Sequence, residues 1–229
     1  MINGIDVSKY QGVINWQAVK ASGKSFVFVR LGWAGYDGRI ADNGGLDEMF
    51  KINAEGAAAA GLNVGVYVYF YAKTPEAAKI AAKETLRLVS PYKLSYPIAF
   101  DIEDNQYCSV AQKSSNTAIA DAFLTEIAAG GYTPLLYTYK SFAESFLNMP
   151  ALSQYDFWVA QYSSVCTYKE AYTIWQHTGD AGRCEGVNGP CDLNTAYKDY
   201  AAPAGTDYKT LYKEAQERID KMKNFIAGA

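Results

Sequence analysis

Tyr96-Pro-Ile-Ala-Phe-Asp-Ile-Glu-Asp104 is the stretch that decides how this chain folds. Its apolar residues have the composition of a buried strand, but Asp101 and Glu103 interrupt them two positions apart. Alternate side chains of a strand point to one face, so both carboxylates are expected on the same side. Unpaired carboxylates in an apolar interior are costly, so that side is expected to open into a polar cleft. Paired carboxylates in a cleft are typical of glycoside hydrolysis.

Outward from this stretch, the composition indicates a soluble chain. It has 229 residues, of which 49% are hydrophobic and 20% charged, and this suits one barrel-sized domain as well as two small ones. Every apolar run is too short to span a membrane. The net charge of −3 does not favour nucleic acid or an anionic envelope, so we predict no nucleic-acid and no membrane partner. The start at Met1-Ile2-Asn3 shows no signal peptide, which predicts either a trimmed chain or another export route.

Strand and helix signals alternate along the first two-thirds of the chain. Strands are predicted at residues 4–7, 26–31, 64–71, 97–103, 135–139, 157–162, 172–176 and just before Cys191-Asp192-Leu193. Helices are predicted at residues 16–22, 46–60, 74–89 and 117–129. The last strands follow one another too closely for a full crossover helix. We therefore predict an α/β fold, an irregular TIM-like barrel of about eight strands whose last three are poor in crossover helices. A doubly wound open sheet is the alternative, disfavoured because no Gly-rich phosphate loop follows a strand.

The composition changes near residue 201, which divides the chain into a predicted catalytic barrel, 1–200, and a C-terminal part, 201–229. Pro203-Ala-Gly-Thr206 is typical of a linker, and residues 208–226 carry an apolar stripe at helical spacing. That amphipathic helix is expected to pack on the barrel, with pairing to another chain or passage into a further domain as alternatives.

Four cysteines show no zinc-like spacing. A turn-rich loop separates Cys184 from Cys191 and could bring them together, so a disulfide and two free thiols are equally expected there. A disulfide between Cys108 and Cys166 is a weaker candidate. Both bridges together would favour an extracellular destination.

Polar and aromatic residues fall at the carboxyl ends of the predicted strands, the end where barrels of this kind place function. They are Asp6, Arg30, Tyr69, Tyr71, Asp101, Glu103, Tyr137, Tyr139, Gln161, Tyr162, Gln176 and Asp192. Each alone has a structural explanation, such as capping a turn or forming an ion pair. Four acids at one end would repel one another unless solvent, a cation or a substrate used them.

Several motifs together resemble glycoside hydrolase family 25, the muramidases of the bacterial, phage and fungal type. The similarity runs in order from residue 4 to about 200 and is carried by Gly4-Ile-Asp-Val-Ser-Lys-Tyr-Gln-Gly12, Gly65-Val-Tyr67, Phe100-Asp-Ile-Glu-Asp104, Tyr137-Thr-Tyr139, Trp158-Val-Ala-Gln-Tyr162, Ile174-Trp-Gln176 and Gly189-Pro-Cys-Asp-Leu-Asn194. The DxE pair alone is weak, whereas the set is specific.

The resemblance implies hydrolysis of the β-1,4 bond between N-acetylmuramic acid and N-acetylglucosamine in peptidoglycan, with no cofactor or metal. It implies that Glu103 is the general acid. Asp101 would stabilise the cationic transition state or orient the substrate N-acetyl group as nucleophile. Asp6 and Asp192 would position water, hydroxyls or the other acids. Like-charge neighbours are expected to raise the pKa of Glu103.

The same resemblance implies a groove for the glycan strand. Its expected substrate-binding residues are Tyr67, Tyr69, Tyr137, Trp158, Gln161, Trp175, Gln176 and Arg30. Many relatives carry histidine where this chain has Val68, which faces away from the groove by strand alternation, so little consequence is expected. His177, the only histidine, is interpreted as a rim residue.

Two rival functions remain open at this level. The four acids could hold a divalent cation in a metal-dependent hydrolase, or a glycan-binding module could keep the groove without catalysis. A nucleophilic triad is disfavoured because no GxSxG elbow occurs. The predicted partner is the glycan strand of bacterial peptidoglycan, the predicted location is extracellular or in the cell wall, and the predicted state is a monomer.

Overall fold

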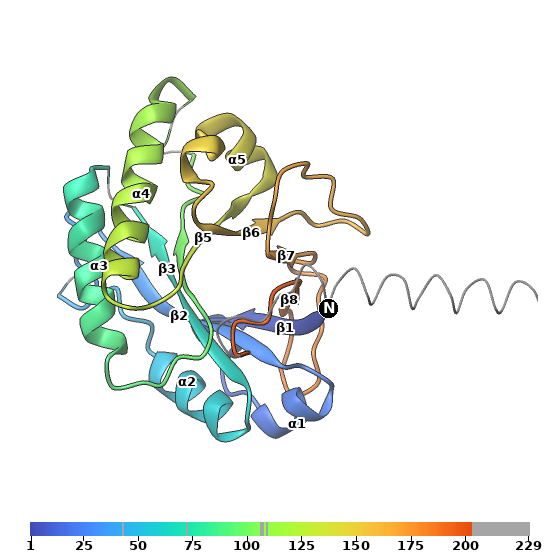
Figure 1. Cartoon of the computed structure of the whole chain (residues 1–229). Helices are drawn as coiled ribbons and strands as arrows, with labels where there is room; N and C mark the ends of the chain where they lie inside the picture. Colours follow the sequence, from blue (N-terminus) through green and yellow to red (C-terminus); the bar gives the residue numbers. More distant parts are fainter. Residues whose placement is uncertain (43, 72, 106–107, 109, 203–229) are drawn as a thin grey trace, which may run out of the picture.

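The chain folds as a closed eight-stranded barrel, seen in a computed structural model that describes residues 1–202 apart from 43, 72, 106, 107 and 109 (Figure 1). The strands follow the chain order around the barrel. They are β1 (Ile2–Val7), β2 (Phe26–Ala34), β3 (Asn63–Phe70), β4 (Ile98–Asp101), β5 (Pro134–Tyr139), β6 (Asp156–Ala160), β7 (Ile174–Gln176) and β8 (Asp192–Ala196). The predicted irregular α/β barrel is confirmed.

Strands β1 to β7 pair in parallel, while β8 runs antiparallel to both of its neighbours, β7 and β1. We expected Asp192 at the carboxyl end of the last strand, and this was wrong because Asp192 is the first residue of β8. Since β8 is reversed, its beginning lies at the barrel end where the parallel strands finish. Asp192 therefore lies at the expected end of the barrel, although it begins its strand rather than ending it.

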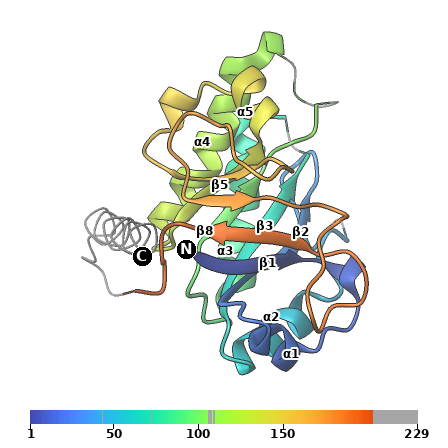
Figure 2. The same ribbon diagram turned by 90° about the vertical axis from the view of Figure 1, so that its right-hand side faces the viewer.

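The helices lie on the outside of the barrel and occupy the connections between the early strands (Figure 1). They are α1 (Trp16–Ala21), α2 (Phe50–Ala59), α3 (Pro75–Val89), α4 (Lys113–Ala129) and the short α5 (Lys140–Phe146), with 3-10 turns at Lys9–Gln11, Val110–Gln112 and Met149–Leu152. Residues 161–173 and 177–191, described throughout, contain no helix. Accordingly β8 and β1 face the viewer in Figure 2 with no helix across them.

Local sequence explains most of these boundaries. Thr74 caps α3 by accepting a hydrogen bond from the Ala77 N–H, with Pro75 at the first helical position. Residues 46–49, predicted as helix, are not helical because Leu46 forms a β-bridge with Gly32. Helix α5 was not predicted.

Two apolar layers hold the barrel together. One lies between the sheet and the helices, and the other fills the barrel interior, where Phe26, Phe28 and Trp158 are the largest side chains. Gly65 makes room for this interior, because a β-carbon there would lie 2.5 Å from the Phe28 ring. The interior packing closes the barrel below the end that carries the acids.

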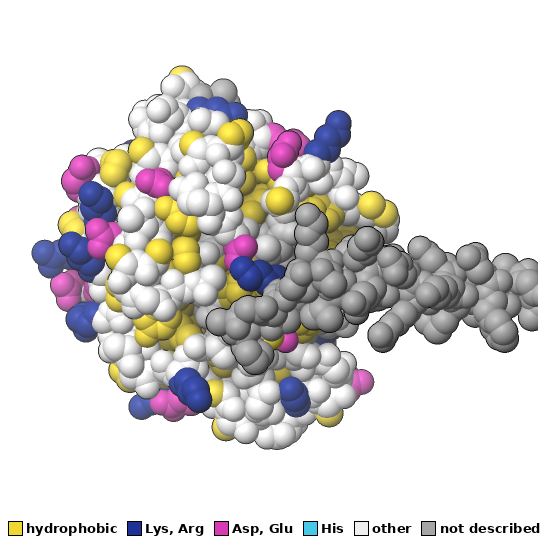
Figure 3. All heavy atoms as spheres, in the orientation of Figure 1, with side chains coloured by type: hydrophobic (Ala, Val, Ile, Leu, Met, Phe, Trp, Pro, Cys, Tyr) yellow, Lys and Arg dark blue, Asp and Glu magenta, His cyan; other side chains and the backbone are white. Residues whose placement is uncertain are grey.

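All four cysteines are free thiols, so neither the Cys184–Cys191 nor the Cys108–Cys166 bridge is formed. The predicted C-terminal helix and the predicted linker, Pro203–Thr206, lie outside the described residues. Among the described helices, none has the length and apolarity needed to cross a bilayer. On the face seen in Figure 3, acidic and basic side chains are interspersed.

Candidate active site

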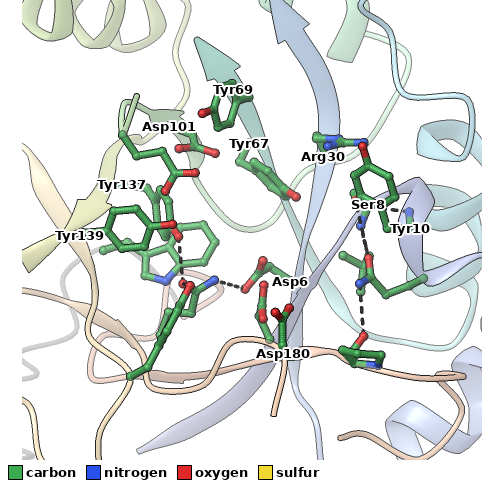
Figure 4. Close-up of a pocket in the computed structure, with 18 residues that line it drawn as sticks. Asp6, Ser8, Tyr10, Arg30, Tyr67, Tyr69, Asp101, Tyr137, Tyr139 and Asp180 are labelled. Atoms are coloured by element: carbon green, nitrogen blue, oxygen red, sulfur yellow. Dashed lines mark hydrogen bonds between the residues drawn. The ribbon is translucent and has the colours of Figure 1, made fainter. Parts of the chain in front are cut away.

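A cleft of about 490 Å³ opens at the end of the barrel where the parallel strands finish (Figure 4). The structure brings together around it ten of the twelve sequence-predicted site residues: Asp6, Arg30, Tyr67, Tyr69, Asp101, Glu103, Tyr137, Trp158, Gln176 and Asp192. The cleft also includes Ser8, Tyr10, Gln11, Tyr139, Tyr162 and Asp180, which the list of expected site residues did not contain.

Asp101 is the last residue of β4 and lies in register between Tyr69 of β3 and Tyr137 of β5. Register partners on adjacent strands point to the same side, so these three side chains form one row inside the barrel mouth. Glu103 lies beyond the strand rather than in it, although the Ile102 N–H still bonds the Tyr137 carbonyl at 3.2 Å. One hydrogen bond thus continues the pairing past the end of β4, and Glu103 lines the cleft.

Both carboxyls retain an unsatisfied oxygen. Asp101 Oδ1 and Glu103 Oε2 are buried and have no hydrogen-bond partner within the described part of the chain. Unpaired buried acceptors are uncommon in folded proteins and call for a specific reason. Both residues line the cleft, so the binding of a ligand there is a reason that their position offers.

Asp6 anchors a hydrogen-bond network on the floor of the cleft. Its Oδ2 accepts from Gln176 Nε2 at 2.9 Å and from Asn194 Nδ2 at 2.7 Å. Gln176 Oε1 in turn accepts from the Tyr137 hydroxyl at 2.8 Å, and Asn194 Oδ1 accepts from the Trp158 indole at 2.9 Å. These buried bonds fix the carboxylate and both amides in one arrangement.

Burial dominates the electrostatics of the two central acids. It raises the pKa of Glu103 to about 7, where Asp6 and Asp104 add to the rise and the hydrogen bond with Tyr139 opposes it. Burial also raises the pKa of Asp101 well above its usual range, and Glu103 and Asp6 raise it further while Arg30 lowers it. We expected like-charge repulsion to be the main cause for Glu103, but desolvation is larger.

Asp6 and Asp192 form a second pair of acids, opposite each other in the β1–β8 register and hydrogen-bonded through their side chains. Burial and then Asp6 raise the pKa of Asp192 to about 8. Burial also raises the pKa of Asp6, against the hydrogen bonds from Asn194 and Gln176. With a pKa of about 8, Asp192 keeps its proton at neutral pH beside Asp6.

Tyrosines form the walls of the cleft. Tyr69, which is half-buried, and Tyr139, which is 37% exposed, lie on either side of the acids, and Tyr67 lies deeper beside Arg30 (Figure 4). Trp158 is only 1% exposed and packs on Phe28 and Tyr137, so it supports the floor rather than offering a free ring face. The walls therefore present aromatic faces and hydroxyls together.

Two predicted site residues do not reach the cleft. Gln176 points into the barrel, so its neighbour Trp175 points outward, where its indole donates to the Gln161 carbonyl at 2.9 Å. The Gln161 side chain bonds Thr167 and holds the loop after β6. The expectation that Trp175 and Gln161 line the groove was wrong, because both follow inward-facing strand residues directly.

The residues missed by sequence reasoning lie mostly in loops. Tyr10 follows β1 and Asp180 follows β7, and both positions come after the carboxyl end of a strand, which is the signal that could have found them. Tyr139 and Tyr162 were noted at strand ends but not assigned to the site. His177 borders a neighbouring hollow with Tyr139 and Asp192, consistent with a rim position.

The acids are not gathered tightly. Within the described ranges, no group of three or more His, Cys, Asp or Glu side chains is placed to hold a metal ion.

Comparisons with known proteins agree with this geometry. The sequence matches Glycosyl hydrolases family 25 over residues 5–187. The autolytic lysozyme of Clostridium acetobutylicum is 29% identical over 195 residues, covering 84% of this chain and 55% of that protein. The modular autolysin LytC of Streptococcus pneumoniae has a TM-score of 0.72 at 27% identity, covering 84% of this chain and 46% of that one. A family 25 glycosyl hydrolase from Bacillus anthracis shares the fold, with a TM-score of 0.72 at 23% identity over 86% of this chain and 89% of that one.

This chain spans about half the length of the first two of these relatives. The family match, in contrast, covers most of this chain and includes the strands that carry Asp6, Asp101 and Gln176 as well as the segment with Glu103. Taken with the closed barrel and its cleft of acids, this match shows that the chain belongs to glycosyl hydrolases family 25.

Proposed function

We propose that this protein is a muramidase, which hydrolyses the β-1,4 bond between N-acetylmuramic acid and N-acetylglucosamine in bacterial peptidoglycan. Family membership supports a glycosidase, and the autolytic lysozyme among the relatives supports this polymer. The Streptococcus pneumoniae autolysin has been solved in complex with a synthetic peptidoglycan ligand, at 26% identity to this chain.

One observation carries the proposal: Asp101 and Glu103 line the same cleft, and each has a buried carboxyl oxygen without a hydrogen-bond partner among the described residues. A purely structural acid would be expected to have its oxygens satisfied by the protein. Two acids with free oxygens, one of them with a pKa of about 7, have the properties of a general acid and its partner carboxylate.

In the proposed reaction, Glu103 gives its proton to the glycosidic oxygen while the bond to the anomeric carbon of the muramic residue breaks. Asp101 accepts a hydrogen bond from the substrate acetamide N–H, so the acetamide oxygen can attack the anomeric carbon. Water then opens this intermediate with Glu103 as base, and configuration is retained. Direct stabilisation of an oxocarbenium ion by Asp101 is the alternative role.

The pH dependence follows from the same acid. Glu103 must be protonated when the substrate arrives, and burial raises its pKa to about 7. We expect kcat/KM to fall as the pH rises through about 7, and activity to favour mildly acidic conditions.

The test is digestion of purified peptidoglycan, followed by identification of the new reducing sugar after borohydride reduction. Muramic ends are expected, whereas glucosamine ends would point to a glucosaminidase. Glu103→Gln should keep its thermal stability and its binding of wall fragments but lose about 10²–10⁴-fold in rate. Glu55→Gln, on the exposed surface of α2, is the matched control and should behave like the parent.

Parental activity in Glu103→Gln would refute the assignment of the general acid. Binding of wall fragments by the parent without any release of reducing ends would instead support a glycan-binding module.

We further propose that the barrel of residues 1–200 is the catalytic unit and that residues 201–229 form a separate C-terminal part. The site of action would be the bacterial cell wall, because this is where the proposed substrate lies.

A further inference from the structure

The charges around the cleft are strongly unequal. Its lining includes Asp6, Asp101, Glu103, Asp180 and Asp192, whereas Arg30 is the one Lys or Arg side chain among the described residues that line it. A strand of uncharged sugars needs no cation in its groove. A single guanidinium kept in an acidic cleft therefore requires a specific explanation.

Arg30 is held from one side only. Its side chain is 17% exposed, and its Nε donates to Asp47 Oδ2 at 2.7 Å. Among the described residues this is the only hydrogen bond of the guanidinium, so the two Nη groups have no protein acceptor. A guanidinium presents its N–H groups as a planar fork that matches the two oxygens of a carboxylate.

Asp47 determines where this fork points. Its carboxylate is 1% exposed and also accepts hydrogen bonds from the Lys9 N–H at 3.0 Å and the Met49 N–H at 2.9 Å. It thus joins Arg30 of β2 to the loop after β1 and to the segment before α2. The β2–β3 register shifts between Arg30 and Gly32, a bulge of the kind that redirects side chains near active sites.

Tyr10 adds an apolar surface beside the cation. Its ring centroid lies 5.1 Å from Arg30 Cζ, yet the residue is 77% exposed. The loop that carries it is fixed by the bond from the Ser8 N–H to Gln11 Oε1 at 2.8 Å, and Gln11 also donates to the Pro190 carbonyl at 3.2 Å. Stacking on the guanidinium face leaves the edge of the fork free for an anion.

Figure 4 shows Arg30 and Tyr10 together on one side of the cleft, across Tyr67 from Asp101. The register agrees, because Arg30 of β2 pairs with Tyr67 of β3, and β4 with Asp101 follows on the other side of β3. Arg30 is therefore a wall residue two strands away from Asp101, where it can contact a substituent of a sugar rather than the bond being cleaved.

We propose that Arg30 binds a carboxylate carried by the muramic residue of the substrate, that Tyr10 packs against the apolar group beside it, and that Asp47 is the positioning residue for both. This inference rests on the proposed function and names the feature of the substrate that the site recognises. The carboxylate comes either from the lactyl group itself or from the peptide stem attached to it, and the two sources are separated by experiment.

The experiment measures dissociation constants by calorimetry in the Glu103→Gln background, so that no cleavage is needed. Four soluble glycan fragments are compared: one with peptide stems, one with stems whose carboxyls have been amidated, one stripped to free lactyl carboxylates, and one stripped and then amidated. Each is titrated into Glu103→Gln alone and into the same background with Arg30→Gln, Arg30→Lys or, as a control, Arg39→Gln, which changes an exposed arginine outside the cleft.

Binding of one charged fragment should weaken about ten- to hundredfold when Arg30 becomes Gln, and by the same factor when the carboxyls of that fragment are amidated. The two changes together should cost no more than either alone. The charged fragment that responds identifies the source. Arg30→Lys should restore part of the affinity, and Arg39→Gln should change nothing.

Equal weakening of charged and amidated fragments by Arg30→Gln would overturn the inference, because Arg30 would then act only as a counter-charge or wall. Absence of any effect, or of any binding by these fragments, would overturn it too. Muramidase activity is measured separately on the parent chain, so failure of the proposed function is distinguishable.

Asp47→Asn tests the positioning role. It keeps an acceptor near the Lys9 N–H but removes the charge that orients Arg30. Weaker binding of the responsive charged fragment, with the amidated fragment unchanged, is expected. Equal changes for both fragments would show that Asp47 supports the fold rather than the recognition of the carboxylate.

Discussion

The network under the cleft predicts a large effect for Gln176→Leu, a change that nearly conserves volume. Gln176 is 2% exposed, and its side chain both donates to Asp6 and accepts from Tyr137. Leucine fills similar space, so little cavity results, but both of these hydrogen bonds and the weaker 3.2 Å bond from the Tyr162 hydroxyl are lost. The perturbation therefore isolates the polar contribution of one buried amide.

The magnitude follows from what each partner loses. A hydrogen bond to a carboxylate is worth about 1.5–3 kcal/mol, and a buried hydroxyl left unpaired costs about 1–3 kcal/mol. Asp6 keeps its 2.7 Å hydrogen bond from Asn194, so its carboxylate still has a donor in the variant. The free energy of unfolding should fall by roughly 3–6 kcal/mol, which for a domain of this size lowers Tm by roughly 6–20 °C.

The loss should depend on pH. Asp6 already has a raised pKa, so the native state binds more protons than the unfolded state above about pH 4, and stability falls as pH rises. Removing the Gln176 donor raises that pKa further and steepens the fall. The difference between variant and parent should be smallest near pH 4 and larger at pH 7.

The assay is thermal unfolding followed by calorimetry at both pH values. Tyr162→Phe is the matched control, because it removes only the 3.2 Å bond of a 52% exposed residue to the same amide oxygen. That control should lose less than about 1 kcal/mol. A Gln176→Leu protein within 2 °C of its parent, or one with equal losses at pH 4 and 7, would refute the reasoning.

Three further changes test other parts of the structure. Asp192→Asn should flatten the decline of Tm between pH 5 and 8, because the raised pKa of Asp192, about 8, makes the parent lose stability over this range. At pH 8 the difference in the free energy of unfolding should be about 1–2 kcal/mol after allowance for partial exposure. An unchanged slope of Tm against pH would contradict the pairing with Asp6. Gly65→Ala should destabilise by about 1–3 kcal/mol in denaturant unfolding, since its β-carbon would clash with Phe28, and a neutral result would show that the interior can relax. Trp175→Phe should keep kcat/KM on peptidoglycan within about twofold of the parent even if Tm falls, because Trp175 faces away from the cleft. A loss of kcat/KM above about tenfold would show that Trp175 contributes to substrate binding or catalysis.

The sequence predicted the first five strands well because each is a distinct apolar run, and a predicted helix follows each of the first four. It also predicted which end carries the site, since Asp6 and Asp101 follow buried strand residues in parallel strands. The direction of β8 was not predictable in this way. A connection of fifteen residues without a helix fits either direction, and apolar content does not depend on direction.

The errors at Trp175 and Gln161 have a different origin. Motif similarity assigned neighbouring residues Trp175 and Gln176 to one groove, but adjacent residues of a strand point to opposite faces. Alternation alone would have required a choice between them, and the structure places Gln176 inside. Tyr10 was missed for the opposite reason, because a loop has no periodicity from which its direction could be inferred.

The reversed strand has a consequence for the chemistry of the cleft. A parallel β8 would place its first residue at the far end of the barrel, so Asp192 could not pair with Asp6. The antiparallel register instead sets Asp192 opposite Asp6 and Asn194 opposite Gly4, where the missing β-carbon makes room for the Phe26 ring. Asn194 can then donate to Asp6 from below while Asp192 reaches it from the cleft. The irregular closure of the barrel is thus what supplies both the amide that holds Asp6 and the acid that shares its proton.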